Sequence, residues 1–258
     1  MKLSLCTDLL YLEIGLTGPV FSDTNKLLEG MDLAKKLGLK AVEFWDWFDK
    51  DWEKLLARKE EYGLEVTAMV AKGGRNLYDP ATLDEALQGM KETVEIAKKF
   101  HCPNIIVNGG NRRDVDRAAA KASMVNMLKQ MAPMVEEAGI TLNLEPLSGS
   151  YFVDSKEPFE IIEEVGSPDV KLLYDIFHYQ MMEGNIVDTI RANLDKIGHI
   201  HAAGVPGRHE IINNELDYTY IFREIEKMGY QGWIALEYLP TMEKEASVKA
   251  CLELINNL

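Results

Sequence analysis

Three carboxylates and one imidazole stand at the ends of four successive apolar segments in the second half of this chain. The segments, 26 to 36 residues apart, are TLNLE ending at Glu145, VKLLYD ending at Asp175, IGHIH ending at His201 and WIALE ending at Glu237. A strand and the helix after it take about 30 residues, and parallel strands present their carboxyl ends at one edge. Carboxylates gathered there repel one another unless a positive charge lies among them, which a divalent cation provides. The spacing therefore predicts a metal site with these four residues as ligands.

Short apolar segments, alternating with longer amphipathic ones, would position these residues. The short segments are β-branched or rich in leucine, as buried parallel strands are. They predict strands at Lys2–Cys6, Ala41–Phe44, Glu65–Val70, Asn104–Asn108, Thr141–Glu145, Val170–Asp175, Ile197–His201 and Trp233–Glu237. The amphipathic segments predict helices near Asp23–Leu37, Asp51–Tyr62, Thr82–Phe100, Val115–Ala138, Pro158–Val165, Ile186–Leu194, Tyr218–Met228 and Glu243–Ile255.

A helix that runs through one glycine into a strand recurs along the chain. Examples are AKKLGLKAVEF, RKEEYGLEVTA, VEEAGITLNLE and EKMGYQGWIALE. This repeated unit, without a Pro- or Ser-rich linker, predicts an α/β fold, a single-domain (β/α)8 TIM barrel over residues 1–258. A doubly wound open sheet is the alternative. The barrel also accounts for the four candidate ligands, because barrel enzymes carry their chemistry at the carboxyl ends of the strands.

The composition limits the partners and the compartment of the protein. The net charge of −14 over 258 residues argues against a nucleic-acid partner. The cysteines, Cys6, Cys102 and Cys251, lie far apart and form no CxxC pair, which favours a reducing compartment. No segment approaches the roughly 20 apolar residues of a membrane span. We therefore expect a cytoplasmic protein with a small-molecule substrate and no membrane partner, and a homo-oligomer is compatible with the sequence.

Two further residues are placed to bind a substrate beside the metal. His178 follows Asp175 in DIFHYQ, and Arg208 lies in the glycine-rich loop GVPGRHE after His201. A guanidinium there could hold a substrate carboxylate or phosphate through two parallel hydrogen bonds. His178 could instead serve as a fifth ligand of the metal. Both residues also have a structural alternative, His178 as an ordinary loop histidine and Arg208 as the partner of Glu210.

Some candidate site residues also have a purely structural interpretation. Asp175 could cap the segment that follows it. A lone histidine at a strand end, such as His201, is often a hydrogen-bonded core residue. Cys6 lies in an apolar segment and is expected in the core rather than as a nucleophile. Glu43 and Trp45, at the end of the second predicted strand, are expected to face the same mouth as the four candidate ligands.

Several strings resemble the hydroxypyruvate isomerase family of the xylose isomerase-like TIM barrel superfamily. They are VEFW, NLEPL, YDIFHYQMMEGNI, GHIHAAGVPGRHE, NELDYTYIF and GYQGWIALEYLP, densest between Asn143 and Pro240. The resemblance implies a catalytic pair that transfers a proton, Glu145 and Glu237. The other roles that it implies are metal ligation by Glu145, Asp175, His201 and Glu237, and substrate binding by His178 and Arg208.

The implied reaction is an aldose–ketose isomerisation of a small hydroxy-oxo acid such as hydroxypyruvate, which would give tartronate semialdehyde. One glutamate removes a proton and the other returns it to the adjacent carbon, through an enediolate. A divalent metal ion stabilises the oxygen anion, and three carboxylates with one imidazole suit Mn²⁺, Mg²⁺ or Co²⁺. His201 stands where the hydroxypyruvate isomerase branch usually has glutamine, and histidine is commoner there among sugar epimerases. A ketose 3-epimerase, or another isomerase or epimerase of this superfamily, is therefore the alternative.

Two other classes of protein agree less well with the residues. A zinc endonuclease of the same fold would need a basic DNA groove and more histidines than the five of this chain. A binding module on a barrel scaffold would not need the pair formed by Glu145 and Glu237. The sequence therefore favours an isomerase over both.

Overall fold

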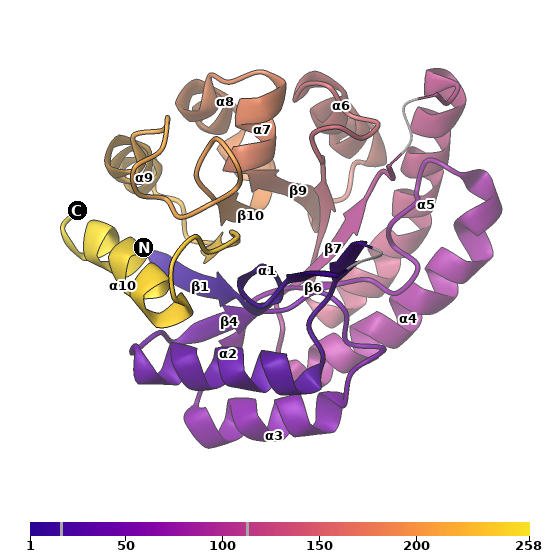
Figure 1. Ribbon diagram of the computed structural model, residues 1–258. Coiled ribbons are helices and arrows are strands. Elements are labelled where there is room, and N and C mark those ends of the chain that lie inside the picture. Colours follow the sequence, from indigo (N-terminus) through magenta and orange to yellow (C-terminus); the bar gives the residue numbers. More distant parts are fainter. Residues whose placement is uncertain (16–17, 112–113) are drawn as a thin grey trace.

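The computed structural model describes residues 1–15, 18–111 and 114–258, and its main sheet is a barrel of parallel strands (Figure 1). The order of its strands is β5 (Glu65–Val66), β4 (Ala41–Glu43), β1 (Lys2–Cys6), β11 (Trp233–Leu236), β10 (Ile197–Ala202), β9 (Val170–Asp175), β8 (Thr141–Glu145), β7 (Asn104–Asn108) and β6 (Met69–Val70). β5 and β6 are two parts of one segment. Thr67 N–H donates to Val42 O at 3.0 Å on one side, and Ala71 N–H donates to Ile106 O at 2.9 Å on the other. The two ends of the sheet therefore meet in one strand, and the barrel closes.

Helices cover the outside of the barrel (Figure 1). They are α2 (Thr24–Lys36), α3 (Trp52–Tyr62), α4 (Leu83–Phe100), α5 (Arg117–Ala138), α6 (Lys156–Val165), α8 (Ile186–Asn193), α9 (Tyr218–Lys227) and α10 (Lys244–Asn256). Shorter elements are α1 (Thr7–Leu10), the antiparallel pair β2 (Glu13–Gly15) and β3 (Gly18–Val20), α7 (Ile176–Met182), and the 3-10 turns η1 (Pro80–Thr82) and η2 (Leu194–Lys196). Within the described residues no helix has both the length and the apolar composition needed to cross a membrane.

The recurring glycine after a helix turns the chain back toward the barrel. Gly63 ends α3 in the left-handed conformation with φ 64°, and Gly139 ends α5 with φ 65°. In the first of these turns Gly63 N–H donates to Glu60 O at 3.2 Å, and Leu64 N–H donates to Lys59 O at 3.0 Å. These bonds satisfy carbonyl groups that the end of a helix leaves unpaired. The helix–glycine–strand phrase in the sequence therefore encodes the return from each of these helices to the next strand.

The predicted barrel is confirmed, and the open-sheet alternative is wrong because the two ends of the sheet meet. Each predicted strand is present within one residue of its predicted ends, except that the third is divided around Thr67 and Ala68. α1 and α7 were not expected from the sequence, because each follows a strand directly and is shorter than two turns. The assignment of residues 1–258 to one domain stays a prediction.

The interior of the barrel is partly polar. A small apolar cluster contains Ala68, Val70, Ile106 and Leu173, with Trp45 packed against it. Beside it lie polar side chains that are at most 4% exposed, namely Ser4, Glu43, Thr67, Asn104, Asn143 and His199. Buried polar groups are costly unless they bond to one another, and several of these do. The Ser4 and Thr67 hydroxyl oxygens lie 2.8 Å apart, and Asn143 Nδ2 donates to Asn104 Oδ1 at 3.0 Å.

Candidate functional site

The structure brings the four predicted ligands to one point at the carboxyl end of the barrel. Glu145 and Asp175 are the last residues of β8 and β9, His201 is the next to last residue of β10, and Glu237 directly follows β11. One donor atom from each of the four lies within 4.8 Å of the others, and all four side chains are buried. Parallel register explains this, since His201 pairs with Asp175 on one side and with Ala235 on the other.

His201 lies between the carboxylates of this cluster and a further glutamate. Its Nδ1 atom is 2.8 Å from Glu237 Oε2, 3.6 Å from Glu145 Oε1 and 4.0 Å from Asp175 Oδ2. Its Nε2 atom is 2.7 Å from Glu43 Oε1. Burial alone lowers the pKa of the ring, but the charges of Glu237 and Glu43 outweigh it and raise the pKa well above its usual value.

The donor set agrees with a divalent cation. The Nδ1 atom of His201 is fully buried and makes no hydrogen bond of good geometry, although it lies 2.8 Å from Glu237 Oε2. Buried polar atoms are seldom left without an aligned partner unless a ligand takes that place. Three carboxylates and one imidazole nitrogen within ligand distance of one another are donors that such a cation accepts. The cluster could therefore hold a metal ion.

Glu237 is held as a carboxylate by donors on both of its oxygens. Trp45 Nε1 donates to Oε1 at 2.7 Å, and the Cys6 thiol faces the same oxygen at 3.7 Å. Arg208 Nη2 donates to Oε2 in a short contact. Burial alone raises the pKa of Glu237, but the charges of His201 and Arg208 lower it well below its usual range. The carboxylate is therefore ionised, as both a ligand and a proton acceptor must be.

The two carboxylate oxygens of Asp175 make different contacts. Its Oδ1 atom accepts hydrogen bonds from Phe177 N–H at 2.8 Å and His178 N–H at 3.2 Å, which caps α7. Its Oδ2 atom faces the cluster and accepts from Arg208 Nη2 at 2.9 Å. The capping interpretation and the site interpretation of this residue are thus compatible.

Arg208 and His178 line the same cluster. The Arg208 side chain is 18% exposed, and its guanidinium contacts Asp175 and Glu237, with Nη1 3.1 Å from His178 Nε2. His178 Nδ1 is 2.8 Å from the Ser148 hydroxyl oxygen. Burial lowers the pKa of His178, so the ring is neutral near pH 7. Glu210, the alternative partner of Arg208, instead accepts hydrogen bonds from Thr241 and Ser247, so it is engaged elsewhere.

Comparisons with known proteins identify the family of this chain. The family described as xylose isomerase-like TIM barrel matches residues 31–258. The chain belongs to this family. It is 32% identical over 249 residues to a putative hydroxypyruvate isomerase of Danio rerio, which covers 89% of this chain and 90% of that protein. It is 36% identical over 217 residues to a 2-oxo-tetronate isomerase of Cupriavidus necator, which covers 79% of this chain and 83% of that protein.

Solved structures of the xylose isomerase-like fold carry several chemistries. An AP endonuclease of family 2 from Brucella melitensis superposes with a TM-score of 0.88 at 23% identity, over 98% of each chain. An L-ribulose 3-epimerase superposes with a TM-score of 0.84 at 19% identity, over 100% of this chain and 94% of that chain. At these identities the likeness shows the fold alone. The curated relatives, by contrast, confirm the predicted family and the prediction of an enzyme of the isomerase class.

One support of the cluster, a contact between Glu43 and His199, was not predicted from the sequence. His199 was not singled out, yet its Nε2 atom is 2.6 Å from Glu43 Oε2. The alternation in IGHIH carried a signal, because residues two apart on a strand share a face and His201 was already assigned inward. The pKa of Glu43, which burial alone would raise, is lowered to about 2 by the charges and hydrogen bonds of His201 and His199. Trp45, which was expected to face the mouth of the barrel, contacts Glu237 directly.

Proposed function

We propose that this protein is an isomerase of a small hydroxy-oxo acid such as hydroxypyruvate, which it converts to tartronate semialdehyde. The reaction moves one proton from C3 to C2 through an enediolate. The observation that carries the proposal is a partly exposed arginine side chain, that of Arg208, whose guanidinium lies beside a buried cluster with two glutamates. A guanidinium in this place suits a substrate that carries its own carboxylate. The names of the curated relatives, hydroxypyruvate isomerase and 2-oxo-tetronate isomerase, agree with such an acid.

Glu145 and Glu237 are the proposed proton carriers. Their strands, β8 and β11, are separated in the barrel by β9 and β10, so the two carboxylates approach the cluster from different sides. One glutamate would take the proton from C3 and the other would deliver a proton to C2. His201, between them, keeps the two carboxylates from facing each other directly, because its Nδ1 atom lies within 3.6 Å of both.

The same four side chains, Glu145, Asp175, His201 and Glu237, are the proposed ligands of a divalent cation. Mn²⁺, Mg²⁺ or Co²⁺ suits this set of oxygen and nitrogen donors, and the bound ion would supply Lewis-acid stabilisation for the enediolate oxygen. The nitrogen donor is His201 Nδ1, which points to the three carboxylates. Asp175 contributes the oxygen that does not cap α7.

Arg208 and His178 are the proposed substrate-binding residues. Arg208 would exchange part of its contact with Asp175 and Glu237 for the substrate carboxylate, since its side chain is 18% exposed whereas both carboxylates are buried. Release of Glu237 from the guanidinium would raise its basicity, since the charge of Arg208 is one cause of its low pKa. The neutral ring of His178 would hydrogen-bond a substrate oxygen.

A substrate panel in D2O tests the function. With Mn²⁺ present, purified protein should convert hydroxypyruvate to tartronate semialdehyde and exchange the transferred hydrogen with solvent deuterium, both followed by proton NMR. A 2-oxo-tetronate should react in the same way, and a neutral ketohexose at least about tenfold more slowly, because it offers Arg208 no carboxylate. Inversion at C3 of a ketohexose, without turnover of either acid, would contradict the proposal and establish the alternative, a ketose 3-epimerase. That alternative is favoured by one observation, a histidine at position 201 in a fold that an L-ribulose 3-epimerase shares.

Replacement of Arg208 by lysine tests the anionic substrate separately. Arg208→Lys keeps the positive charge and removes the planar fork, so one of two charge-assisted hydrogen bonds to a carboxylate is lost. We expect KM for hydroxypyruvate to rise about tenfold, the effect of about 1.4 kcal/mol. Dihydroxyacetone, in which a hydroxymethyl group replaces the carboxylate, serves as the neutral control, and its inhibition constant should change less than threefold. An equal rise in KM for hydroxypyruvate and in the inhibition constant of dihydroxyacetone would mean that Arg208 does not bind the substrate carboxylate.

A further inference from the structure

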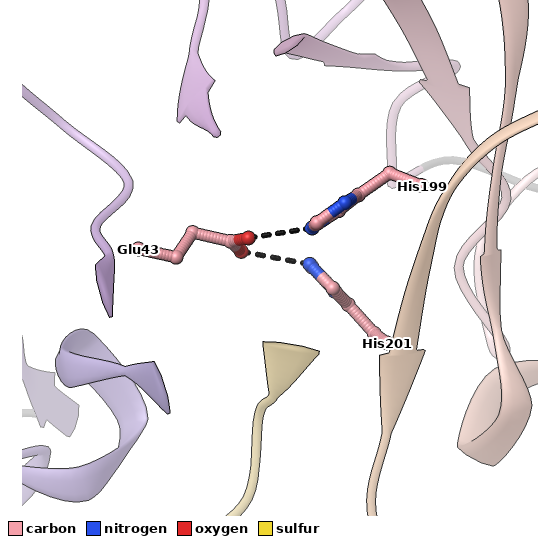
Figure 2. Close-up of side chains that lie close together, drawn as sticks. All are labelled: Glu43, His199 and His201. Carbon is pink, nitrogen blue, oxygen red and sulfur yellow. Dashed lines mark hydrogen bonds and ion pairs between the residues drawn. The ribbon is translucent and has the colours of Figure 1, made fainter. Parts of the chain in front are cut away.

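Glu43 faces two histidines, His199 and His201 (Figure 2). It is the last residue of β4 and is fully buried, and its two oxygens face different rings. Oε1 is 2.7 Å from His201 Nε2, and Oε2 is 2.6 Å from His199 Nε2. β4 and β10 are separated in the sheet by β1 and β11, so these contacts cross the interior of the barrel.

We propose that Glu43 is a positioning residue that fixes the orientation and tautomer of His201, and that His199 in turn holds Glu43. The proposal rests on the proposed role of His201 as a metal ligand. Glu43 and His199 lie outside the set of four proposed ligands, and their contacts would hold one of those ligands, His201, in place. Neither Glu43 nor His199 would touch the substrate.

The contacts of Glu43 decide which nitrogen of His201 carries hydrogen. A carboxylate only accepts hydrogen bonds, so the Nε2 atoms of both rings must present N–H groups to it. The remaining nitrogen of His201, Nδ1, faces Glu145, Asp175 and Glu237, and a cation bound there would take the place of its hydrogen. A histidine that binds a metal generally donates its other N–H to a carboxylate or carbonyl, which fixes the ring and makes the ligand more basic.

The alternative, a second cation held by Glu43, His199 and His201 themselves, disagrees with the charges. This group has one carboxylate between two imidazoles, whereas the cluster of Glu145, Asp175, His201 and Glu237 has three carboxylates for a cation to balance. The two nitrogen–oxygen distances, 2.6 and 2.7 Å, match direct N–H to oxygen contacts. The three residues therefore form a support rather than a site of their own.

His199 gives Glu43 a second anchor on the side away from the cluster. The two imidazole rings lie at 82° to each other with centroids 5.1 Å apart, so one carboxylate reaches both. Thr67 Oγ1 lies 3.4 Å from Oε2 of the same carboxylate. An isolated buried carboxylate is strongly destabilising, so the two histidines also make it possible for Glu43 to stay in the core as an anion.

The variants that test this proposal are Glu43→Gln and, as a matched control, Thr67→Val. Glutamine keeps the size of the side chain, but its amide can accept from one ring only and presents hydrogens to the other. Valine at position 67 removes the hydroxyl beside Glu43 and leaves both histidine contacts. Mn²⁺ affinity is measured by titration calorimetry, the hydrogen on His201 Nε2 by ¹⁵N NMR of histidine-labelled protein with and without Mg²⁺, and folding by thermal unfolding.

We expect Glu43→Gln to weaken Mn²⁺ binding about 10- to 100-fold and to change the ¹⁵N pattern of His201. Thr67→Val should bind Mn²⁺ within about threefold of the parent protein. Unchanged Mn²⁺ affinity together with an unchanged tautomer in Glu43→Gln would overturn the proposal. If Glu43→Gln does not fold, His199→Gln, which leaves the contact between Glu43 and His201, replaces it and should weaken Mn²⁺ binding by a smaller factor; no change would again overturn the proposal.

The two readouts separate this inference from the proposed function. Should the parent protein not bind Mn²⁺, Mg²⁺ or Co²⁺, the metal role of the cluster fails, whereas the NMR measurement still decides whether Glu43 keeps a hydrogen on His201 Nε2. Loss of this hydrogen in Glu43→Gln then supports the positioning role, and its retention rejects it.

Discussion

Replacement of Glu237 by glutamine is expected to lower kcat by a factor of about 10²–10⁴, the usual contribution of general acid–base catalysis. The amide retains an oxygen that can serve as a ligand but cannot accept a proton at neutral pH. The exchange of substrate hydrogen with D2O should fall with kcat, because it needs the same base. Steady-state kinetics at saturating Mn²⁺, with the exchange rate measured by NMR, checks both effects.

Glu157→Gln is the matched control for this variant. Like Glu237, Glu157 accepts from an arginine and from an aromatic side chain, here Arg117 and Tyr151, but it lies on α6 away from the cluster. Its replacement should therefore cost comparable hydrogen bonding and leave kcat within about twofold. Full activity of Glu237→Gln at saturating metal would reduce Glu237 to a ligand, and the proposed transfer between two glutamates would fail.

The barrel and the gathering of the four residues could be predicted because both depend on local pattern. A segment such as TLNLE predicts a buried strand. Its last residue is the polar group that lies at the carboxyl end of that strand. Parallel strands then bring Glu145, Asp175, His201 and Glu237 to one edge, whatever the details of the helices between them. The meeting of these four residues does not depend on closure of the barrel, because β8 to β11 are consecutive neighbours in the sheet.

The support of the cluster by Glu43 and His199 could not be predicted in the same way, because it depends on contacts across the barrel. Glu43 is 156 residues from His199 in sequence, and their strands are not neighbours in the sheet. Only the closed barrel makes these side chains meet. The contacts of Arg208 had a similar origin: its loop could be placed near His201 from the sequence, but its contacts with Asp175 and Glu237 depend on the path of that loop.

α7 shows how a short element can be hidden by the strand before it. The string VKLLYDIFHYQ reads as one apolar segment, and seven helical residues are too few to display a period of 3.6. Asp175 ends the strand and caps the helix with one carboxylate, so a single residue marks both boundaries. The turn into α7 also brings His178 back over the cluster, 3.5 Å from Asp175 Oδ2.

Asp175→Asn is expected to act through metal affinity rather than through proton transfer. Asparagine caps a helix about as well as aspartate, so the start of α7 should be kept. The lost charge would weaken the hold on a cation and the contact with Arg208. At limiting Mn²⁺ we expect activity to fall by about 10- to 100-fold, and excess Mn²⁺ should restore a substantial part of it.

Activity measured as a function of Mn²⁺ concentration separates Asp175 from Glu237. The apparent Kd for Mn²⁺ should rise in Asp175→Asn while kcat at saturation stays near that of the parent, whereas Glu237→Gln should remain slow at every concentration. The contrast follows from position. Asp175 lies between the two glutamates in the ring, where one of its oxygens is fixed by the backbone of α7 and the other points into the cluster. If no concentration of Mn²⁺ restores the activity lost in Asp175→Asn, Asp175 takes part in the chemistry itself. The assignment of proton transfer to Glu237 and of metal binding alone to Asp175 would then be wrong.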